Sequence, residues 1–219
     1  MFGDDLNMKS RKIGIMGGTF NPIHYAHLLL AENAREQFGL DRIIFIPSGQ
    51  PYMKVQKEDK NIPSGELRYQ MVKMAIQENP YFTCSRIEID RPGKTYTVDT
   101  LHELQKMYPG DELFFIMGAD SLLSMESWYQ FEDIFQMAAI LVAVRDDTDE
   151  KKLTDVITRM KSKYLADIRM VMTGRMDISS TMIREKIKTG KSVRYLLPED
   201  CVEYICLKNL YSQQQEGII

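Results

Sequence analysis

The sequence predicts an α/β fold, in which helices cover both faces of a doubly wound, mostly parallel sheet and a small helical portion follows at the C-terminus. Short apolar runs alternate with segments of helical periodicity along almost the whole chain, and this alternation is typical of parallel sheets. The length of 219 residues suits one such domain, which can bury a sufficient core without disulfides or a structural metal. No run approaches the roughly 18 uninterrupted apolar residues of a membrane-spanning helix, so we expect no membrane partner.

Six apolar or alternating runs are expected to form the strands of this sheet. They span residues 12–18, 42–48, 83–89, 112–118, 138–145 and 168–173. Helical patterns lie near residues 22–38, 64–78, 97–107, 149–163 and 179–189, and a last helix is expected to begin at Pro198. Gly39 and Gly190 follow two of these patterns and are typical helix stop signals. Ligands of such sheets bind at the carboxyl ends of the strands, which makes the loops there the candidates for chemistry.

The composition indicates how the chain is organised and where it works. We expect one domain over residues 12–211, a flexible extension over 1–11 and a polar tail over 212–219. The polar, mixed-charge start lacks the apolar core of a signal peptide. The three cysteines are odd in number and show no C-x-x-C spacing, which favours a reducing compartment over a disulfide framework or a zinc site. We therefore expect a cytoplasmic protein.

The charge of the chain limits how it could hold an anionic ligand. Lys and Arg number 28 against 31 Asp and Glu, which gives a formal net charge of -3. A nonspecific grip on nucleic acid needs a basic surface, so we expect no nucleic-acid partner. A polyanionic ligand would have to be held by a few well-placed cations.

The segment GGTFNPIHYAHL, residues 17–28, follows the first predicted strand and has the features of a phosphate site. Asn21 can cap the following helix, and Pro22 suits its first position. His24 and His27 then lie one turn apart on the same face. The N–H groups and dipole of a helix N-terminus attract anions, and glycines let a phosphate approach the backbone. Two imidazoles there could donate hydrogen bonds to phosphate oxygens as negative charge develops during transfer.

The apolar pattern of the same helix supports a second interpretation of His27. The residue lies on one stripe with Leu30, Ala31, Ala34 and Phe38, where a histidine can simply pack in the core. The paired histidine, the Asn-Pro cap and the double glycine favour the functional interpretation.

A second candidate phosphate site lies in ISSTMIREKI, residues 178–187. Ser179 or Ser180 can cap a helix, so that hydroxyls, backbone N–H groups and Arg184 converge on phosphate oxygens. An ordinary serine cap with a surface arginine would have the same local sequence. The phosphate interpretation gains its weight from the first segment.

The segment IMGADSLLSMESWYQFEDI, residues 116–134, lies between the two candidate sites. Asp120 follows a predicted strand end, where a carboxylate can bind ribose hydroxyls or cap a helix. Trp128 and Tyr129 are expected to begin a helix. Such aromatic residues more often pack in a core, but a flat ring can also stack on a ligand such as a pyridine ring.

The motifs together resemble a known family. GGTFNPIHYAH resembles the H-x-G-H signature of nucleotidyltransferases, with Ala26 where glycine is usual, and ISSTMIR resembles the I-S-S-T-x-I-R element of the same superfamily. With PSGQPYMK, RYQMVKMA, TYTVDTL, GADSL followed by WY, and VAVR, the pieces cover nearly the whole chain and resemble the bacterial nicotinate-nucleotide adenylyltransferases. The resemblance implies a Rossmann-like fold and an enzyme of NAD biosynthesis. Such an enzyme transfers the adenylyl group of ATP, which carries Mg²⁺, to nicotinate mononucleotide and forms nicotinate adenine dinucleotide (deamido-NAD) and pyrophosphate.

The same resemblance implies the residues of the site. His24, His27 and Arg184 would be catalytic, and no residue is implied as a direct metal ligand. The ATP site would comprise Gly17, Gly18, Thr19, Phe20, His24, His27, Asp120, Ser179, Ser180 and Arg184. The acceptor site would comprise Lys54 and Arg145 for the phosphate and Tyr96, Thr97, Trp128 and Tyr129 around the ring. Single basic residues are often only solvated charges.

One loop departs from the family pattern, and several alternatives remain open. The family often has P-P-H-K where this chain has Pro51-Tyr52-Met53-Lys54, so the contacts at 52–53 differ. Another acceptor, such as phosphopantetheine, nicotinamide mononucleotide or the substrate of a cytidylyltransferase, would fit the superfamily. A noncatalytic nucleotide-sensing module would fit the same fold. The sequence leaves the oligomeric state open, a homo-oligomer included.

Overall fold

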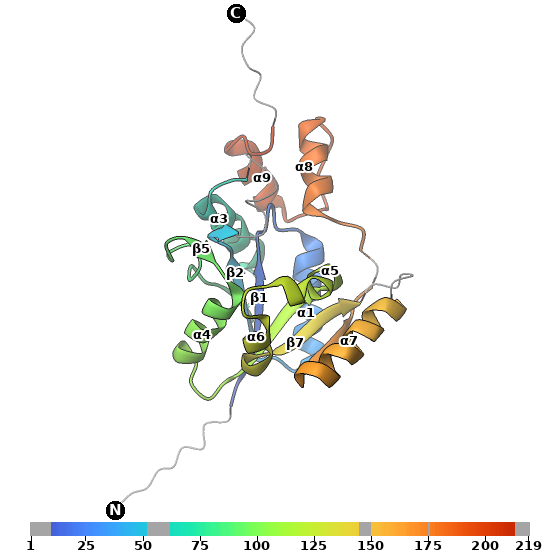
Figure 1. Ribbon diagram of the computed structural model, residues 1–219. Coiled ribbons are helices and arrows are strands. Elements are labelled where there is room, and N and C mark those ends of the chain that lie inside the picture. Colours follow the sequence, from blue (N-terminus) through green and yellow to red (C-terminus); the bar gives the residue numbers. More distant parts are fainter. Residues whose placement is uncertain (1–9, 52–61, 145–149, 175, 213–219) are drawn as a thin grey trace, which may run out of the picture.

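The computed structural model describes residues 10–51, 62–144, 150–174 and 176–212, and it confirms the α/β fold (Figure 1). Its main sheet has six strands, all paired in parallel, in the order β4-β2-β1-β6-β7-β8. These strands are β1 (Lys12–Gly18), β2 (Arg42–Pro47), β4 (Phe82–Cys84), β6 (Glu112–Gly118), β7 (Ala139–Val144) and β8 (Ile168–Met172). A short parallel pair, β3 (Gln50–Pro51) with β5 (Lys94–Thr95), lies apart from the main sheet.

Helices cover both faces of the sheet (Figure 1). They are α1 (Tyr25–Phe38), α3 (Gly65–Ile76), α4 (Thr97–Met107), α5 (Ala119–Leu123), α6 (Phe131–Met137), α7 (Glu150–Tyr164), α8 (Ser180–Lys188) and α9 (Glu199–Leu207), with a 3₁₀ turn η1 (Met125–Ser127). The predicted strands and helices are confirmed in order and type, apart from the differences given below. Within the described part of the chain, no helix has the length and apolar character that crossing a membrane requires.

The alternation of side chains along the strands produces two cores. Ile13 and Ile15 of β1 pack against the helices α4, α5, α6 and α7. Met16 of the same strand belongs to the other core, with α1, α3, α8 and α9. Successive side chains of a strand point to opposite faces, so each strand that is covered on both faces reads as a continuous apolar run.

The first helix begins later than the sequence predicts. We expected Asn21 as its cap and Pro22 as its first residue, but α1 begins at Tyr25, and His24 is the cap, with an extended backbone (φ -153°). The prediction was wrong because Asn21 and Pro22 form a turn before the helix. The peptide bond between them is cis. The end of the helix is as predicted, since Gly39 takes the left-handed conformation with φ 61° that glycine adopts without strain.

Two other local predictions were wrong. The alternating run 83–89 forms a strand only over Phe82–Cys84, and the chain then turns, with the N–H of Ile89 donating to the carbonyl of Arg86 at 2.8 Å. After the strand, the apolar and polar residues still alternate in sequence but do not alternate in burial. Ile87 packs on a core and the next residue, Glu88, is also buried, without strand pairing. Trp128 and Tyr129 do not begin a helix, because α6 starts only at Phe131, after Gln130 in a left-handed conformation.

The sheet order places the candidate motifs at a topological switch point. The chain continues from β1 to β2 on one side, whereas β6 on the other side of β1 continues to β7. In doubly wound folds the ligand crevice lies at the carboxyl ends of the two strands between which the order reverses. Here these strands are β1 and β6, whose register pairs Ile13 with Leu113 and Ile15 with Phe115. The GGTF turn after β1 and the GAD turn after β6 therefore lie side by side.

Candidate functional site

The turn after β1 brings the backbone of the GGTF motif into a tight bend. Phe20 has a left-handed backbone (φ 48°), which is uncommon for a residue with a side chain and occurs often at functional sites. Its ring is buried and lies edge-on to His27, with ring centroids 5.2 Å apart. A Cβ at Gly18 would lie 3.2 Å from the same ring. The glycine thus lets the phenylalanine fold back over the end of the strand.

The two histidines are stacked at the beginning of α1. Their ring centroids are 3.8 Å apart with an angle of 32° between the planes. The backbone N–H of His24 donates to Nδ1 of His27 at 3.3 Å. Since Nδ1 accepts this bond, the hydrogen of the neutral His27 ring sits on Nε2. The contact therefore fixes His27 in the tautomer that donates from its outer nitrogen.

The histidines differ in how far they are exposed. His24 is 5% exposed, whereas His27 is half-buried. Because the helix begins at Tyr25, His24 is the cap and His27 is the third helical residue, where we expected His24 near that position. His27 thus offers the more open imidazole to a ligand.

Helix α8 begins directly against the turn that precedes α1. The hydroxyl of Ser180 donates to the carbonyl of Pro22 at 2.9 Å, and Nη1 of Arg184 donates to the carbonyl of Asn21 at 2.9 Å. These bonds join residues about 160 positions apart in the chain. The two helix beginnings that the sequence singled out therefore share one edge of the sheet.

The two serines of α8 have different bonding roles. Ser179 is the cap, and its hydroxyl oxygen accepts from the N–H of Met182 at 3.2 Å. A hydroxyl that accepts one bond can still donate another, so Ser179 can donate to a phosphate oxygen. Ser180 gives its only hydroxyl hydrogen to Pro22 and holds the turn in place. Its backbone N–H, in the first turn of α8, has no intrahelical acceptor.

Asp120 lies in the turn after β6, as predicted. It is exposed in the first turn of α5, whose cap is Gly118. Its carboxylate is therefore not the helix cap, which was one of the two interpretations of the sequence. An exposed carboxylate beside the switch point remains compatible with binding the hydroxyls of a ribose.

The predicted aromatic residues form two groups. The rings of Tyr96 and Tyr129 come from α4's cap and the segment before α6, and their centroids are 4.7 Å apart. Tyr129 is 53% exposed, so this pair can meet a ligand. Trp128 is half-buried, packs edge-on against Phe115 at 6.3 Å and belongs with the core. Its Nε1 is buried and has no partner within the described part of the chain.

Two predicted phosphate contacts lie outside the described residues. They are Lys54 and Arg145. The described chain before Lys54 ends at Pro51 in β3, which pairs Gln50 with Lys94 and Pro51 with Thr95. Pro51 therefore lies close to the beginning of α4, where Tyr96 and Thr97 lie.

One residue at the site was missed by the sequence reasoning. Arg68 of α3 is 1% exposed and donates to four backbone carbonyls. Three of these carbonyls lie in the loops after β1 and β2, and they belong to Thr19 (2.7 Å), Ser48 (2.6 Å) and Gly49 (3.1 Å). Burial lowers the pKa of its guanidinium from the ordinary value. The signal in the sequence is an arginine on a buried helical stripe with Met71 and Val72, three and four residues later.

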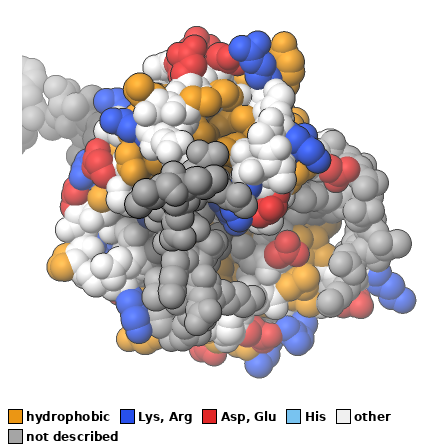
Figure 2. All heavy atoms as spheres, turned by 90° about the horizontal axis from the view of Figure 1, so that it is seen from above, with side chains coloured by type: hydrophobic (Ala, Val, Ile, Leu, Met, Phe, Trp, Pro, Cys, Tyr) orange, Lys and Arg blue, Asp and Glu red, His pale blue; other side chains and the backbone are white. Residues whose placement is uncertain are grey.

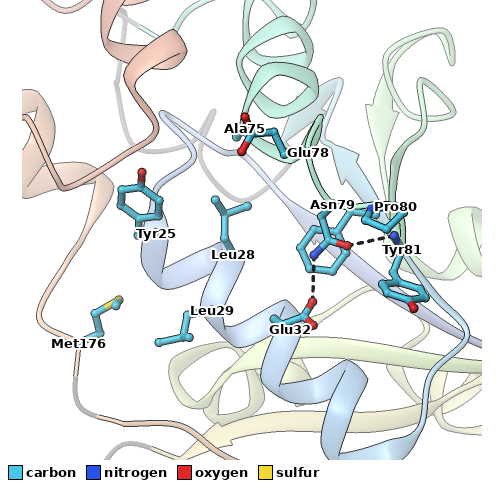
Figure 3. A pocket seen from close by; sticks show the side chains of 11 residues that line it. Tyr25, Leu28, Leu29, Glu32, Ala75, Glu78, Asn79, Pro80, Tyr81 and Met176 are labelled. Carbon is cyan, nitrogen blue, oxygen red and sulfur yellow. Dashed lines mark hydrogen bonds between the residues drawn. The ribbon is translucent and has the colours of Figure 1, made fainter.

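A groove of about 590 Å³ runs along α1 from its first residue, Tyr25 (Figure 3). It is lined by Tyr25, Leu28, Leu29, Glu32, Ala75, Glu78, Asn79, Pro80, Tyr81, Phe82 and Met176. The figure shows α1 on one side and the segment around Asn79 on the other, joined by the bond from Asn79 to Glu32 at 3.0 Å. None of the predicted site residues lines this groove.

The face at which the strands end is seen from above in Figure 2. Lys and Arg side chains and Asp and Glu side chains both occur around its edge, as expected for a net charge of -3. With a net charge of -3, the binding of phosphate would depend on local donors at the helix beginnings and not on an overall positive charge.

Comparisons with known proteins show the family of the chain. A family model described as cytidylyltransferase-like matches residues 15–186. A Lachnoclostridium phytofermentans protein, described as a probable nicotinate-nucleotide adenylyltransferase, is 46% identical over 92% of this chain and 99% of its own. A Desulfitobacterium hafniense (strain Y51) protein with the same description is 41% identical over 94% of this chain and 99% of its own.

Solved structures share the fold. The nicotinic acid mononucleotide adenylyltransferase of Plasmodium falciparum complexed with NaAD superposes with a TM-score of 0.73, over 92% of this chain and 97% of that one, at 18% sequence identity. The same enzyme complexed with APC gives a TM-score of 0.71 at 17% identity. At this identity the likeness shows the fold alone.

Proposed function

The chain belongs to the cytidylyltransferase-like family and, within it, to the nicotinate-nucleotide adenylyltransferases, and from this membership we propose how its site performs the transfer. ATP gives its adenylyl group to nicotinate mononucleotide, and the products are nicotinate adenine dinucleotide and pyrophosphate. The observation that carries the proposal is the junction of α1 and α8, which brings one imidazole pair and one serine cap to a single edge of the sheet.

The reaction needs alignment more than proton transfer. A phosphate oxygen of the mononucleotide attacks the α-phosphorus of ATP, the bond to the bridging oxygen breaks, and pyrophosphate leaves. The attacking phosphate is already ionised at neutral pH, so no general base is required. The protein has to hold two anions in line although they repel each other, and to stabilise the charge that develops.

The residues at the helix junction fit these tasks. His27 presents Nε2–H as a donor because its Nδ1 is used by the backbone of His24. Ser179 has a hydroxyl hydrogen to donate, and the first N–H groups of α8 lack intrahelical acceptors. Arg184 carries five donor hydrogens, and its bond to Asn21 holds the guanidinium at this edge. We propose that these groups receive the phosphates of ATP.

The acceptor would lie on the side of α4. Tyr96 and Tyr129 place two rings where a pyridine ring could stack. Helix α4 begins at Thr97, so the N–H groups of its first turn have no intrahelical acceptors and favour a carboxylate. Backbone N–H groups bind the nicotinate carboxylate more strongly than the nicotinamide amide, because hydrogen bonds to an ionised acceptor are stronger.

The other charged groups of the reaction are a metal ion, two basic residues and one carboxylate. Mg²⁺ would enter with ATP, since this ion binds substrate phosphates and keeps several of its waters. Lys54 and Arg145 would bind the phosphate of the mononucleotide. Asp120 would bind the ribose hydroxyls of ATP.

The test compares acceptors with ATP held constant. Pyrophosphate release is measured with nicotinate mononucleotide, nicotinamide mononucleotide and phosphopantetheine, each with and without the purified chain. We expect the acid mononucleotide to have the highest kcat/KM. A higher value for the amide would contradict the role given to the beginning of α4, and ATP binding without turnover on any acceptor would favour a nucleotide sensor.

A further inference from the structure

Arg68 is the largest side chain that the described fold encloses fully, at 1% exposure. It lies near the start of α3, after the cap Ser64. Among the described residues, no Asp or Glu forms an ion pair with its guanidinium. A buried charge is costly unless it is compensated by hydrogen bonds, so its bonding partners indicate what the fold gains from it.

All of its hydrogen bonds go to backbone carbonyls. Nη1 donates to Thr19 at 2.7 Å, and Nη2 donates to Ser48 at 2.6 Å and to Gly49 at 3.1 Å. Nε donates to Pro63 at 3.0 Å. The planar fork thus ties together the turn after β1, the turn after β2 and the segment before α3.

The bonds to the two turns also fix where the next amides point. In a planar trans peptide the carbonyl and the following N–H point in opposite directions. The carbonyl of Thr19 faces Arg68, so the N–H of Phe20 points away from it. The carbonyl of Ser48 also faces Arg68, so the N–H of Gly49 points away from Arg68. Within the described part of the chain, neither N–H has a backbone acceptor.

The position of Gly49 supports the same geometry. A Cβ at this residue would lie 2.1 Å from the carbonyl oxygen of Glu88, so only glycine fits between that carbonyl and the turn. The turn is therefore held from two sides, by Arg68 and by the backbone at Glu88. An amide held in this way costs little reorganisation when an anion arrives.

We infer that Arg68 is a positioning residue of the proposed reaction. Its guanidinium turns the carbonyls after β1 and β2 inward, and the amides of Phe20 and Gly49 are left as donors for phosphate oxygens of the substrates. Its charge lies behind these amides, where little solvent screens it, and adds to the attraction. The inference rests on the proposed function.

Three variants separate positioning from mere stability. Arg68→Met keeps an unbranched apolar side chain, which is shorter than that of arginine, and removes the donors. Arg68→Lys keeps the charge but has one nitrogen in place of a planar fork. Val72→Ala is the matched control, because Val72 is also fully buried on α3 and is not among the residues that Arg68 bonds. Each variant is compared with the wild-type chain at a temperature where circular dichroism shows it folded.

Kinetics and amide exchange are the two measurements. We expect Arg68→Met to lower kcat/KM by about 10²-fold, the loss typical of misplaced groups, and Arg68→Lys to lower it by about 10-fold because the fork is lost. Hydrogen exchange without substrate should become faster in both variants at the bonded amides of the two turns, such as that of Ser48, which donates to the carbonyl of Gly18 at 2.9 Å. Val72→Ala should lower the melting temperature and leave kcat/KM and these amides close to wild type.

Several outcomes would overturn the inference. One is a wild-type kcat/KM in folded Arg68→Met. Another is a loss of kcat/KM in Val72→Ala that equals the loss in Arg68→Met when both variants have the same drop in melting temperature. If Arg68→Met does not fold, wild-type kinetics in Arg68→Lys overturns it. If the wild-type chain shows no transfer at all, the proposed function fails. Unchanged exchange at the Ser48 amide in Arg68→Lys would still decide against positioning.

Discussion

At the scale of single residues, the site depends on how each donor is already used. His27 accepts from the backbone through Nδ1 and so donates from Nε2, whereas Ser180 has given its hydrogen to Pro22. Residue type alone does not reveal this difference, because both side chains have the right chemistry for a phosphate. The hydrogen bonds that position a side chain decide which of its atoms remains for a ligand.

Replacing His27 tests its role as a donor. We expect His27→Ala to lower kcat by about 10²-fold or more, the usual effect of removing a donor that stabilises developing charge, with little change in fold. Pyrophosphate release gives kcat, and thermal unfolding monitors the fold. His102, the third histidine of the chain, is exposed on α4, so His102→Ala is the matched control. Equal kcat in the two variants would place His27 in the core and out of the reaction.

At the scale of elements, we propose that the beginning of α8 has a binding role in addition to its structural one. The hydroxyl of Ser179 accepts from Met182 and caps the helix, and its hydrogen can still reach a phosphate. Ser179→Ala should destabilise the fold by about 1 kcal/mol, whereas Ser179→Gly should cost only a few tenths, because glycine is tolerated at a cap. Both variants lose the hydroxyl and should raise KM for ATP alike.

Urea unfolding and the KM for ATP separate the two roles of Ser179. If the KM for ATP changes in the alanine variant and stays unchanged in the glycine variant, it follows the stability of the fold. Ser179 would then act as a helix cap and would not contact the ligand. An equal rise in both variants, at unequal stability, supports the direct contact.

The elements that the sequence predicts well are those fixed by local chemistry. Gly39 ends α1 because a left-handed residue is needed there, and β1 and β6 are apolar because both faces of the sheet are covered. The start of α1 was not predictable in the same way, because Asn21 has the chemistry of a cap yet its carbonyl is bonded by Arg184, 163 residues later in the chain. The role of Arg68 was not predicted for a similar reason. Its partners are backbone carbonyls distant in the sequence, and no pattern of side chains indicates them.

At the scale of the whole molecule, the sheet order assembles the site. Residues after β1, after β6 and at the start of α8 meet because the strand order reverses between β1 and β6. The sequence predicted an α/β sheet and the motifs at its strand ends. It did not predict which strands are neighbours, and this order follows from long-range pairing. Nor did it indicate the buried acidic group that binds helix α4.

That group is Glu88, which is 8% exposed and accepts from the hydroxyl of Thr100 on α4 at 2.8 Å. Burial raises its pKa above the ordinary value of 4.5, so the folded protein binds this proton more tightly than the unfolded chain. Its contribution to stability is then fully present below about pH 4.5 and is lost as the pH rises through the folded pKa. Glu88→Gln keeps an acceptor for Thr100 and removes the titration.

The pH dependence of Glu88→Gln relative to wild type isolates this one group, because all other titrations cancel in the difference. The free energy of unfolding of the variant, measured with urea from pH 4 to pH 8, should rise relative to wild type as the pH increases, since only wild type has to bury a carboxylate there. Asp111→Asn, measured down to about pH 2, is the control of opposite sign, because hydrogen bonds from Arg11 lower the pKa of Asp111 from the ordinary value of 3.8. This variant should lose stability relative to wild type at neutral pH and approach it only as the pH falls below that value. Parallel curves for Glu88→Gln and wild type would show that the carboxylate is solvated, and α4 would then have to be held by its apolar face alone.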